Sequence, residues 1–463
     1  MTSWAATELQ SVTLRDARLR NRLFRMVDSL IAQPTASIPA ASGSWAATKA
    51  AYRFLASPSV TPEAIRAAHQ HATLARIAAQ STVLVIQDAT ELDFTRHPAT
   101  SGLGYLDHPK HQGLKAHVAL AATTDGVPLG LVDQFVWVRD AAQMGKKRQR
   151  AKRAVTDKER QRWATSLHVT QHAIPADCRV VAVADREADL SPLFAAERRA
   201  GVDVLIRAAQ NRRVDADTRL LDDAIAAAPV RGTLTIDVPQ RDEHPARRAQ
   251  LAIRWTSVRL CPPQHAKGRA TLPHIPVQVA VAEEQTPPPG VTALRWVVVT
   301  TLDVTTWDDA LQVVRWRRTR WLIERYHYVL KSGCRIERLH LETAERLQRA
   351  LAVYCVVARR LVWLTYAARQ DAEEACTAVL GRHEWQALYC TIHQTPHPPP
   401  TPPTLRQAVR WIAQLGGFLA RNGDGEPGVQ TIWRGLRRLD DIAATWLLLQ
   451  RAPPDQRDDS TYG

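Results

Sequence analysis

The sequence predicts an α/β protein with a mixed central sheet, an inserted antiparallel β domain, and all-helical regions at both ends. Two observations predict the central sheet. Apolar runs rich in β-branched residues finish in an acid at Asp88 and again at Asp185, and strand and helix patterns follow the order β-β-β-α-β-α-β over residues 81–209. A third observation predicts the insertion, because residues 211–304 form a run of strand patterns with little helical pattern between them.

These changes of pattern divide the 463 residues into three predicted domains. Residues 1–75 form a basic helical domain, in which a cap and a proline at residues 59–63 begin the last helix. Residues 76–370 carry the sheet, with the β insertion at about 211–304. Residues 371–463 form a second helical domain, which contains a proline-rich linker or loop at residues 397–403.

Charge and cysteine usage limit the function classes. A formal net charge of +15 makes polyanions the natural partners, with nucleic acid first among them. The six cysteines include no C-x-x-C pair, which argues against a zinc ribbon and fits reduced thiols in a cytoplasm. No apolar run of membrane-spanning length and no secretory leader is evident in the sequence. We therefore expect a cytoplasmic protein.

A basic stripe with one acid is predicted on a helix near residue 320. No Gly or Pro interrupts residues 315–331, and the helix is expected to run from its cap at Thr306 to Gly333. At 3.6 residues per turn, one helical face then carries Arg317, Arg320, Glu324, His327 and Lys331. The stripe is either a metal-binding carboxylate among phosphate-binding cations or a solvated basic face with an ordinary salt bridge.

The two strand-end acids favour the first interpretation. Carboxylates at the ends of neighbouring buried strands project into the crevice where α/β sheets bind ligands, although an Asp after a strand is also a common cap or turn residue. Together with Glu324, Asp88 and Asp185 make three carboxylates, enough to hold two divalent ions for an in-line phosphoryl displacement. Oxygen ligands suit Mg²⁺ or Mn²⁺ better than zinc. His117 and His327 could assist or be packing residues.

Several motifs resemble the DDE transposases of bacterial insertion sequences, in particular the insertion-sequence-four family. They are the Asp-Arg-Glu-Ala-Asp run at residues 185–189, Asp88 with Thr90, and the Arg-Trp-x-Ile-Glu-x-x-His pattern at residues 320–327. The family signature is Tyr, Arg, Glu and Lys with two, three and six residues between them. Arg320, Glu324 and Lys331 keep this spacing, whereas Arg317 stands at the tyrosine position.

The resemblance implies a ribonuclease-H-like core interrupted by the β insertion. It implies that Asp88, Asp185 and Glu324 ligate two Mg²⁺ ions, for which Mn²⁺ can substitute. It further implies that Trp296 stacks on a flipped base, although a sheet-face core role is the alternative for this residue. The implied DNA-binding residues are Arg320, Lys331, Arg317, Trp296, Trp321, His327 and Arg207.

The function implied by the resemblance is cut-and-paste DNA transposition. Hydrolysis at a transposon end, hairpin formation, hairpin opening and strand transfer to target DNA would all use the same two-metal site. The expected partners are double-stranded DNA, as inverted-repeat ends and as target, and a second copy of the chain in a dimer that bridges two ends. Two alternatives remain: a catalytically silent DNA-binding protein derived from a transposon, and a stand-alone ribonuclease-H-like nuclease.

Overall fold

The computed structural model forms two compact units. One comprises Met1–His69, Arg96–Leu103 and Arg325–Gly463 and is helical; the other comprises Gln70–Thr95 and Gly104–Glu324 and carries the sheet. We call them the helical unit and the sheet unit. The structure describes residues 3–108, 110–140, 159–215, 219–238, 246–263, 272–370, 373–421 and 423–451.

The sheet unit contains one mixed sheet, which has ten strands among the described residues. Neighbouring strands follow the order β2-β3-β1-β5-β6-β10-β9-β8-β7, and β4 pairs with the outer side of β3. The strands are β1 (Thr82–Asp93), β2 (Gly104–Tyr105), β3 (Gln112–Thr123), β4 (Pro128–Trp137), β5 (Arg179–Ala184), β6 (Val202–Arg207), β7 (Gly232–Val238), β8 (Arg247–Leu260), β9 (Ile275–Glu284) and β10 (Arg295–Thr300).

Strand β1 is longer than the sequence predicts. Its antiparallel pairing with β3 continues to Asp93, opposite Gly113, whereas its parallel pairing with β5 stops at Gln87, opposite Ala184. Asp88 therefore lies in the interior of a strand and not at its end, which corrects the prediction. The hydrophobic run ends at Asp88 because β1 loses one of its two neighbours there.

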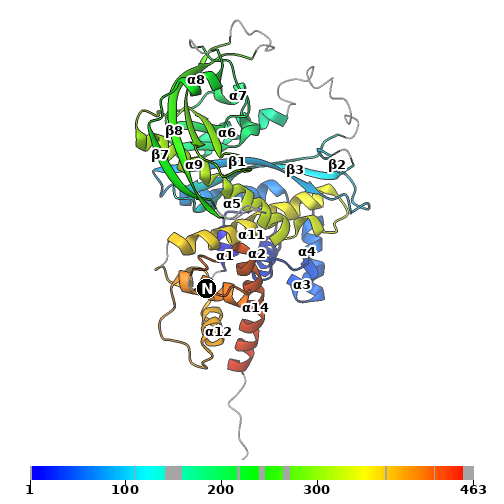
Figure 1. Cartoon of the computed structure of the whole chain (residues 1–463). Helices are drawn as coiled ribbons and strands as arrows, with labels where there is room; N and C mark the ends of the chain where they lie inside the picture. The colour runs from blue at the N-terminus through cyan, green and yellow to red at the C-terminus, as the bar shows by residue number, and fades with distance from the viewer. Residues whose placement is uncertain are drawn as a thin grey trace, which may run out of the picture. The chain divides into compact units, whose positions relative to one another are not determined.

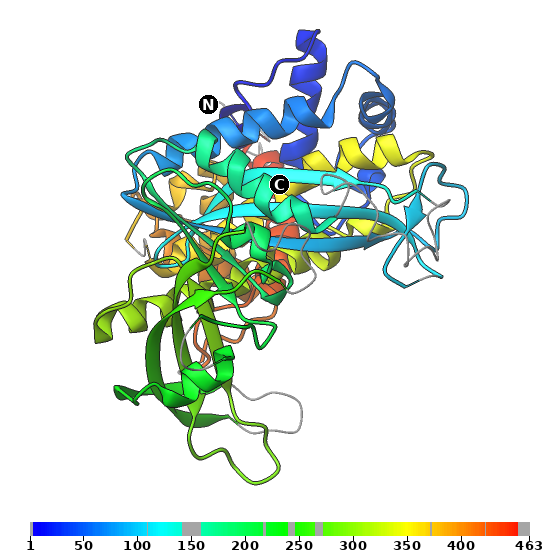
Figure 2. The same cartoon turned by 90° about the horizontal axis from the view of Figure 1, so that it is seen from above.

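The strands that follow residue 211 continue the same sheet. Strands β7 to β10 are antiparallel to one another, and β10 also pairs antiparallel with β6 through Val298 and Arg207. Figures 1 and 2 show β7 and β8, in green, running at a steep angle to β1 and β3, as expected of a strongly twisted sheet. A short helix, α8 (Leu221–Ala227), lies within this stretch, where the sequence indicates little helix.

Helix α6 (Arg162–Ala173) covers part of the sheet, and its Trp163 and Leu167 join a core that includes Val83 and Val85 of β1. Helix α7 (Ser191–Phe194) lies between β5 and β6 in the sequence. Helix α9 (Trp307–Thr319) follows β10 and opens with a capping box between Thr306 and Asp309.

The single long helix predicted to end at Gly333 is interrupted. Helix α9 stops at Thr319, Arg320 lies between the two helices, and α10 covers Trp321–Tyr328. The N–H of Arg320 donates to the carbonyls of Arg317 and Arg318, a tightened turn that breaks the regular ladder. Residues Val329–Gly333 then form a π-helical turn. The even spacing expected along one face therefore does not hold over its whole length.

The helical unit is built around α11 (Ala344–Gln370), which contacts α2 and α4. By length and composition, Ala344–Arg369 passes as a membrane-spanning helix, unlike any run noted in the sequence, yet 89% of its most apolar window is buried inside the protein. It is the core helix of the unit. The other helices are α1 (Trp4–Glu8), α2 (Ala17–Ala32), α3 (Ile38–Ser42), α4 (Trp45–Ala56), α5 (Pro62–Ile77, which continues into the sheet unit), α12 (Arg382–His393), α13 (Leu405–Leu415) and α14 (Val429–Arg451).

Two glycines let α13 and α14 cross at close range. A Cβ on Gly435 would overlap the carbonyl oxygen of Ile412, and one on Gly416, just after α13, would overlap that of Thr431. Both obstacles are backbone atoms, which cannot rotate away. The crossing therefore requires the small residue on each side.

We expect Gly435→Ala to lower the free energy of unfolding by about 1–3 kcal/mol, because the helices must separate to admit the methyl group. Helix propensity alone would act the other way, since Ala is favoured over Gly by about 1 kcal/mol inside a helix. Thermal unfolding, followed by circular dichroism, shows whether the free energy of unfolding falls or rises. Gly428→Ala is the control, because no atom lies within 4 Å of a Cβ at that position. A stabilised Gly435→Ala protein would contradict the close crossing.

Candidate functional site

Asp88 and Asp185 lie side by side because of strand register. The last parallel pair between β1 and β5 is Gln87 with Ala184; Asp88 is the next residue of β1, and Asp185 is the first residue after β5. Beyond this pair β1 continues along β3, while β5 turns into a short 3₁₀ helix that Asp185 begins. The two strands therefore separate at Asp88 and Asp185, and β1 and β5 form no backbone pairing beyond these two acids.

Arg320 connects Glu324 to this pair of acids. Glu324 lies in the first turn of α10, and Arg320 occupies the break just before that helix. The Arg320 guanidinium is paired with the Glu324 carboxylate, and its Nη2 atom also lies 3.8 Å from Oδ2 of Asp185. One guanidinium nitrogen thus lies between the second and third acids of the predicted triad.

Asp185 is surrounded by cations. Besides Arg320, Nη2 of Arg317 lies 3.4 Å from its Oδ1 atom and Nη1 of Arg207 lies 3.9 Å from the same oxygen. Burial raises the pKa of Asp185, but the N–H of Arg186 and the three guanidinium groups more than offset this, and the pKa falls below its usual range. Asp185 is therefore ionised at neutral pH.

Asp88 has a different electrostatic environment. Burial raises its pKa to about 7; the N–H of Ala89 and the charge of Arg320 oppose the rise, and Glu187 and Glu324 add to it. A carboxyl whose neighbours include two further acids carries excess negative charge, which a bound cation would offset. The arginines thus compensate Asp185 and Glu324 more fully than they compensate Asp88.

The donor set fits a hard divalent cation. All three triad side chains offer carboxylate oxygens, the ligands that Mg²⁺ prefers. Within the described part of the chain, however, no group of three or more His, Cys, Asp and Glu side chains is gathered closely enough to hold a metal ion. The guanidinium of Arg320, which lies between Asp185 and Glu324, explains why these two carboxylates are too far apart to share an ion. For Asp185 and Glu324 to share an ion, Arg320 must move from between them.

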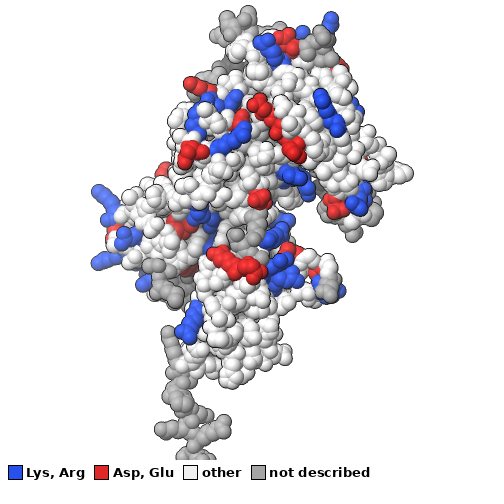
Figure 3. Space-filling model, turned by 90° about the vertical axis from the view of Figure 1, so that its left-hand side faces the viewer, with Lys and Arg blue, Asp and Glu red and all other residues white. Residues whose placement is uncertain are grey.

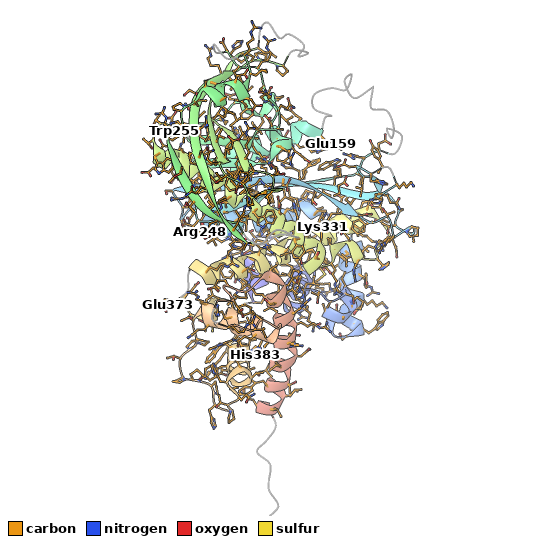
Figure 4. The ribbon with its side chains drawn as sticks, in the orientation of Figure 1. Glu159, Arg248, Trp255, Lys331, Glu373 and His383 are labelled. Atoms are coloured by element: carbon orange, nitrogen blue, oxygen red, sulfur yellow. The ribbon has the colours of Figure 1, made fainter. Side chains whose placement is uncertain are left out.

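The structure places the other predicted residues as follows. Arg207 ends β6 beside Asp185, and Trp321, at the start of α10, is 53% exposed. Trp296 lies in β10 opposite Ala282 and is partly buried. His327 and Lys331 belong to the helical unit. His327 is buried, and Lys331 (Figure 4) has its Nζ atom 3.8 Å from Oε1 of Glu337. Within the sheet unit, the structure thus brings together Asp88, Asp185, Glu324, Arg207, Arg317 and Arg320.

Asp189, the last acid of the 185–189 motif, has a positioning role that the sequence analysis missed. It is buried, and its carboxylate accepts hydrogen bonds from the N–H groups of Ala209 and Gln210 and from Nε of Arg212. These contacts fix the chain just after Arg207. The signal available in the sequence was a second acid four residues after Asp185, with the apolar residues Ala188 and Leu190 on either side of it.

His117 is not part of this site. Its ring lies 3.3 Å from Oε1 of Gln87, measured from Nε2, and edge-on to Trp163 of α6. Successive side chains of a strand point to opposite faces, so Gln87 and Asp88 project to different sides of the sheet. Burial lowers the pKa of His117 to about 4, and the ring is therefore neutral at pH 7. It is a packing residue.

We expect Asp88→Asn to stabilise the protein in a pH-dependent manner. The folded-state pKa of about 7 lies above the ordinary value of 3.8, so protonation favours the fold, and the wild-type protein loses stability as pH rises from about 4 to about 7. The amide does not ionise. The gain in free energy of unfolding should therefore grow over this window to a few kcal/mol and stay constant above it.

Urea unfolding at several pH values, without added divalent ions, measures this difference. Asp177→Asn, at an exposed position, serves as the matched control and should show no such trend. A gain that is the same at pH 5 and pH 8 would refute the electrostatic explanation.

Comparison with protein families agrees with the geometry over most of the chain. Residues 1–60 match the family model described as Transposase DNA-binding. Residues 79–358, more than half of the chain, match Transposase DDE domain, and residues 356–445 match Transposase Tn5 dimerisation domain. The three matches follow one another in the order of a Tn5-like DDE transposase. The chain accordingly belongs to the DDE transposases, metal-dependent enzymes that cut DNA and transfer DNA strands.

Proposed function

We propose that the chain is a cut-and-paste DNA transposase that uses Mg²⁺. The observation that carries the proposal is the placement of Asp88 and Asp185 at the point where β1 and β5 separate, with Glu324 joined to Asp185 through Arg320. Once Arg320 has moved from between Asp185 and Glu324, the three carboxylates would suit a pair of divalent ions, which when bound would activate an attacking oxygen and stabilise the leaving one. Mn²⁺ meets the same ligand requirements.

Strand order supports a ribonuclease-H-like core. Strands β4, β3, β1, β5 and β6 are neighbours in that order, with β3 antiparallel to β1 and with β5 and β6 parallel to it. Strands β7 to β10 then form the proposed insertion, at about residues 211–304. With this core at residues 76–370, we assign DNA binding to residues 1–75 and dimerisation to residues 371–463.

The residues of the chain have distinct roles in the proposed reaction. The carboxylates of Asp88, Asp185 and Glu324 hold the cations and set the position of the reacting phosphate. Arg320 and Arg317, which now contact Asp185, exchange a carboxylate for a DNA phosphate as the end binds. Four steps then share one geometry. They are hydrolysis of one strand, attack of the freed 3′-hydroxyl on the other strand, opening of the resulting hairpin, and joining to target DNA.

The remaining DNA contacts are proposed by position and chemistry. Arg207, 3.9 Å from Asp185, is near enough to contact the same phosphates. Trp321 offers a half-exposed indole at the start of α10, suited to stacking on a base. Trp296 is proposed to stack on the flipped base of the hairpin, and Lys331 and His327 to contact phosphate. The active species is a homodimer on two transposon ends, in the bacterial cytoplasm.

Glu324→Gln tests the enzyme directly. We expect the rate of metal-dependent cleavage of the transposon end to fall by about 10³-fold or more, because losing several kcal/mol of transition-state stabilisation has that effect. The substrate is a duplex carrying the inverted repeats beside the coding region, with Mg²⁺, and products are separated on denaturing gels. Glu373→Gln makes the same chemical change at an exposed position (Figure 4) and should cleave normally.

Two outcomes would replace the proposal. Specific DNA binding without any cleavage by the wild type would favour a silent DNA-binding protein, whereas normal cleavage by Glu324→Gln would reject the proposed catalytic triad. Cut products without joined products, when target DNA is supplied, would favour a simple nuclease. The matches to DNA-binding and dimerisation domains at the two ends of the chain speak against the nuclease, which needs neither.

Arg317→Gln tests whether the arginines compete with the cations. The Arg317 guanidinium lies 3.4 Å from Oδ1 of Asp185, and burial, aided by Arg320, lowers its pKa to about 10, so it stays charged at pH 7. Removing this charge should strengthen Mn²⁺ binding several-fold in calorimetry without DNA. Arg179→Gln, at a residue that pairs with Asp203 on the same sheet, is the control. Unchanged or weaker Mn²⁺ binding by Arg317→Gln would contradict the competition.

A further inference from the structure

A cavity of about 750 Å³ opens on the helical unit, and none of the three residues of the proposed catalytic triad lines it. It lies between the π-helical turn after α10 and the first half of α14, so all its lining residues belong to one compact unit. The residues that line it are Thr35, Tyr328, Ser332, Arg335, Gly416, Gln430, Trp433, Arg434, Arg437, Arg438 and Asp441. We call it the α14 pocket.

Backbone features build the pocket. A Cβ on Gly333 would overlap the ring of Trp433, so the glycine lets the indole pack directly against the π-helical turn. The Tyr328 ring lies 5.8 Å from the Trp433 ring, and its hydroxyl accepts a hydrogen bond from Nε2 of Gln430. Arg335 has a φ of +52°, a left-handed conformation that is uncommon for a side chain of this size. The pocket is therefore a built feature of the fold.

The lining of the pocket is strongly basic. Arg434, Arg437 and Arg438 are three and four residues apart, so they share one face of α14. Arg335 joins them from the turn, and Asp441 is the one acid in the lining, which leaves a formal charge of 4 − 1 = +3. Among the described residues, no carboxylate pairs with the guanidinium of Arg335, Arg434 or Arg437. Arg438 is held by the carbonyl of Leu415, 2.5 Å from its Nη1.

We propose that the α14 pocket binds phosphates of the double-stranded DNA backbone. Guanidinium groups bind phosphate through paired N–H donors, and the hydroxyls of Thr35 and Ser332 add neutral donors of the kind that contact the DNA backbone. This inference rests on the proposed function for the identity of its ligand, and adds a contact region that the triad does not provide.

Two observations favour DNA over an acidic protein surface. The largest apolar side chain of the pocket, Trp433, is only 6% exposed and has little surface left to bury against a partner. The face drawn in Figure 3 shows basic and acidic side chains interspersed, so the formal charge of +15 does not form a uniformly basic surface there. Local groups of unpaired arginines, such as this one, are where phosphate can bind.

The test measures the salt dependence of DNA binding by the full chain. Fluorescence anisotropy with a labelled 40-base-pair duplex of arbitrary sequence gives the binding constant at several NaCl concentrations. We expect Arg434→Gln/Arg437→Gln to reduce the slope of log K against log[NaCl] by about 1.8, since each phosphate contact contributes about 0.9. The control, Arg369→Gln/Arg382→Gln, removes the same charge from exposed positions outside the pocket and should leave the slope unchanged.

A second measurement uses the wild-type protein and does not depend on how a variant folds. Phenylglyoxal modifies accessible arginines, and mass spectrometry reports the extent at each one. The duplex should protect Arg434 and Arg437 and leave Arg382 reactive. Equal modification with and without DNA, or equal slopes for the two double variants, would overturn the proposal. So would loss of self-association in sedimentation by the pocket variant with an unchanged slope, which would mark a protein interface.

The outcomes separate this inference from the proposed function. A reduced slope combined with no metal-dependent cleavage by the wild type would support the pocket and reject the transposase reaction. Normal cleavage that is lost in Glu324→Gln, combined with an unchanged slope in the pocket variant, would reject the pocket alone.

Discussion

The site in the sheet unit depends on the point at which β5 stops following β1. Up to Gln87 and Ala184 the two strands are paired, and the next residues are Asp88 and Asp185. Because β3 pairs with β1 on its other side as far as Asp93, the backbone at Asp88 stays part of the strand after its parallel neighbour has ended. The two carboxylates thus follow directly after the last paired residues of the two strands, at the point where the strands separate. Everything proposed about metal binding follows from this register.

Such a concentration of acids needs compensation in the folded protein. Like charges held close together oppose folding unless a cation or a proton offsets them. The protein does this in two ways: Asp185 and Glu324 are paired with arginines, whereas the pKa of Asp88 is raised, mainly by burial. The break between α9 and α10 matters here, since it places Arg320 where one guanidinium reaches both carboxylates. Stability and metal binding therefore draw on the same groups.

Much of the sheet could be predicted because hydrophobic pattern reports burial directly. The runs before Asp88 and Asp185 end where pairing between the two strands ends, so the acids were found even though β1 itself continues. The tightened turn at Arg320 and the π-helical turn at Val329–Gly333 could not be predicted. Neither turn leaves a local signal in the sequence, and at the π-helical turn Gly333 is packed against the ring of Trp433, a residue 100 positions away along the chain.

Pairing, more than the number of basic residues, decides which arginines are available to a polyanion. At the proposed catalytic site each guanidinium close to Asp185 already contacts a carboxylate, so DNA must displace an existing partner and its net gain is reduced by that loss. In the α14 pocket, Arg335, Arg434 and Arg437 pair with no carboxylate among the described residues, so no ion pair has to be broken there. Phosphate contacts made by the arginines of the α14 pocket would therefore supply affinity for DNA of any base sequence. The arginines beside Asp185 instead favour a ligand that brings phosphate and divalent cations together. Only then does each arginine gain a phosphate partner while each carboxylate gains a cation.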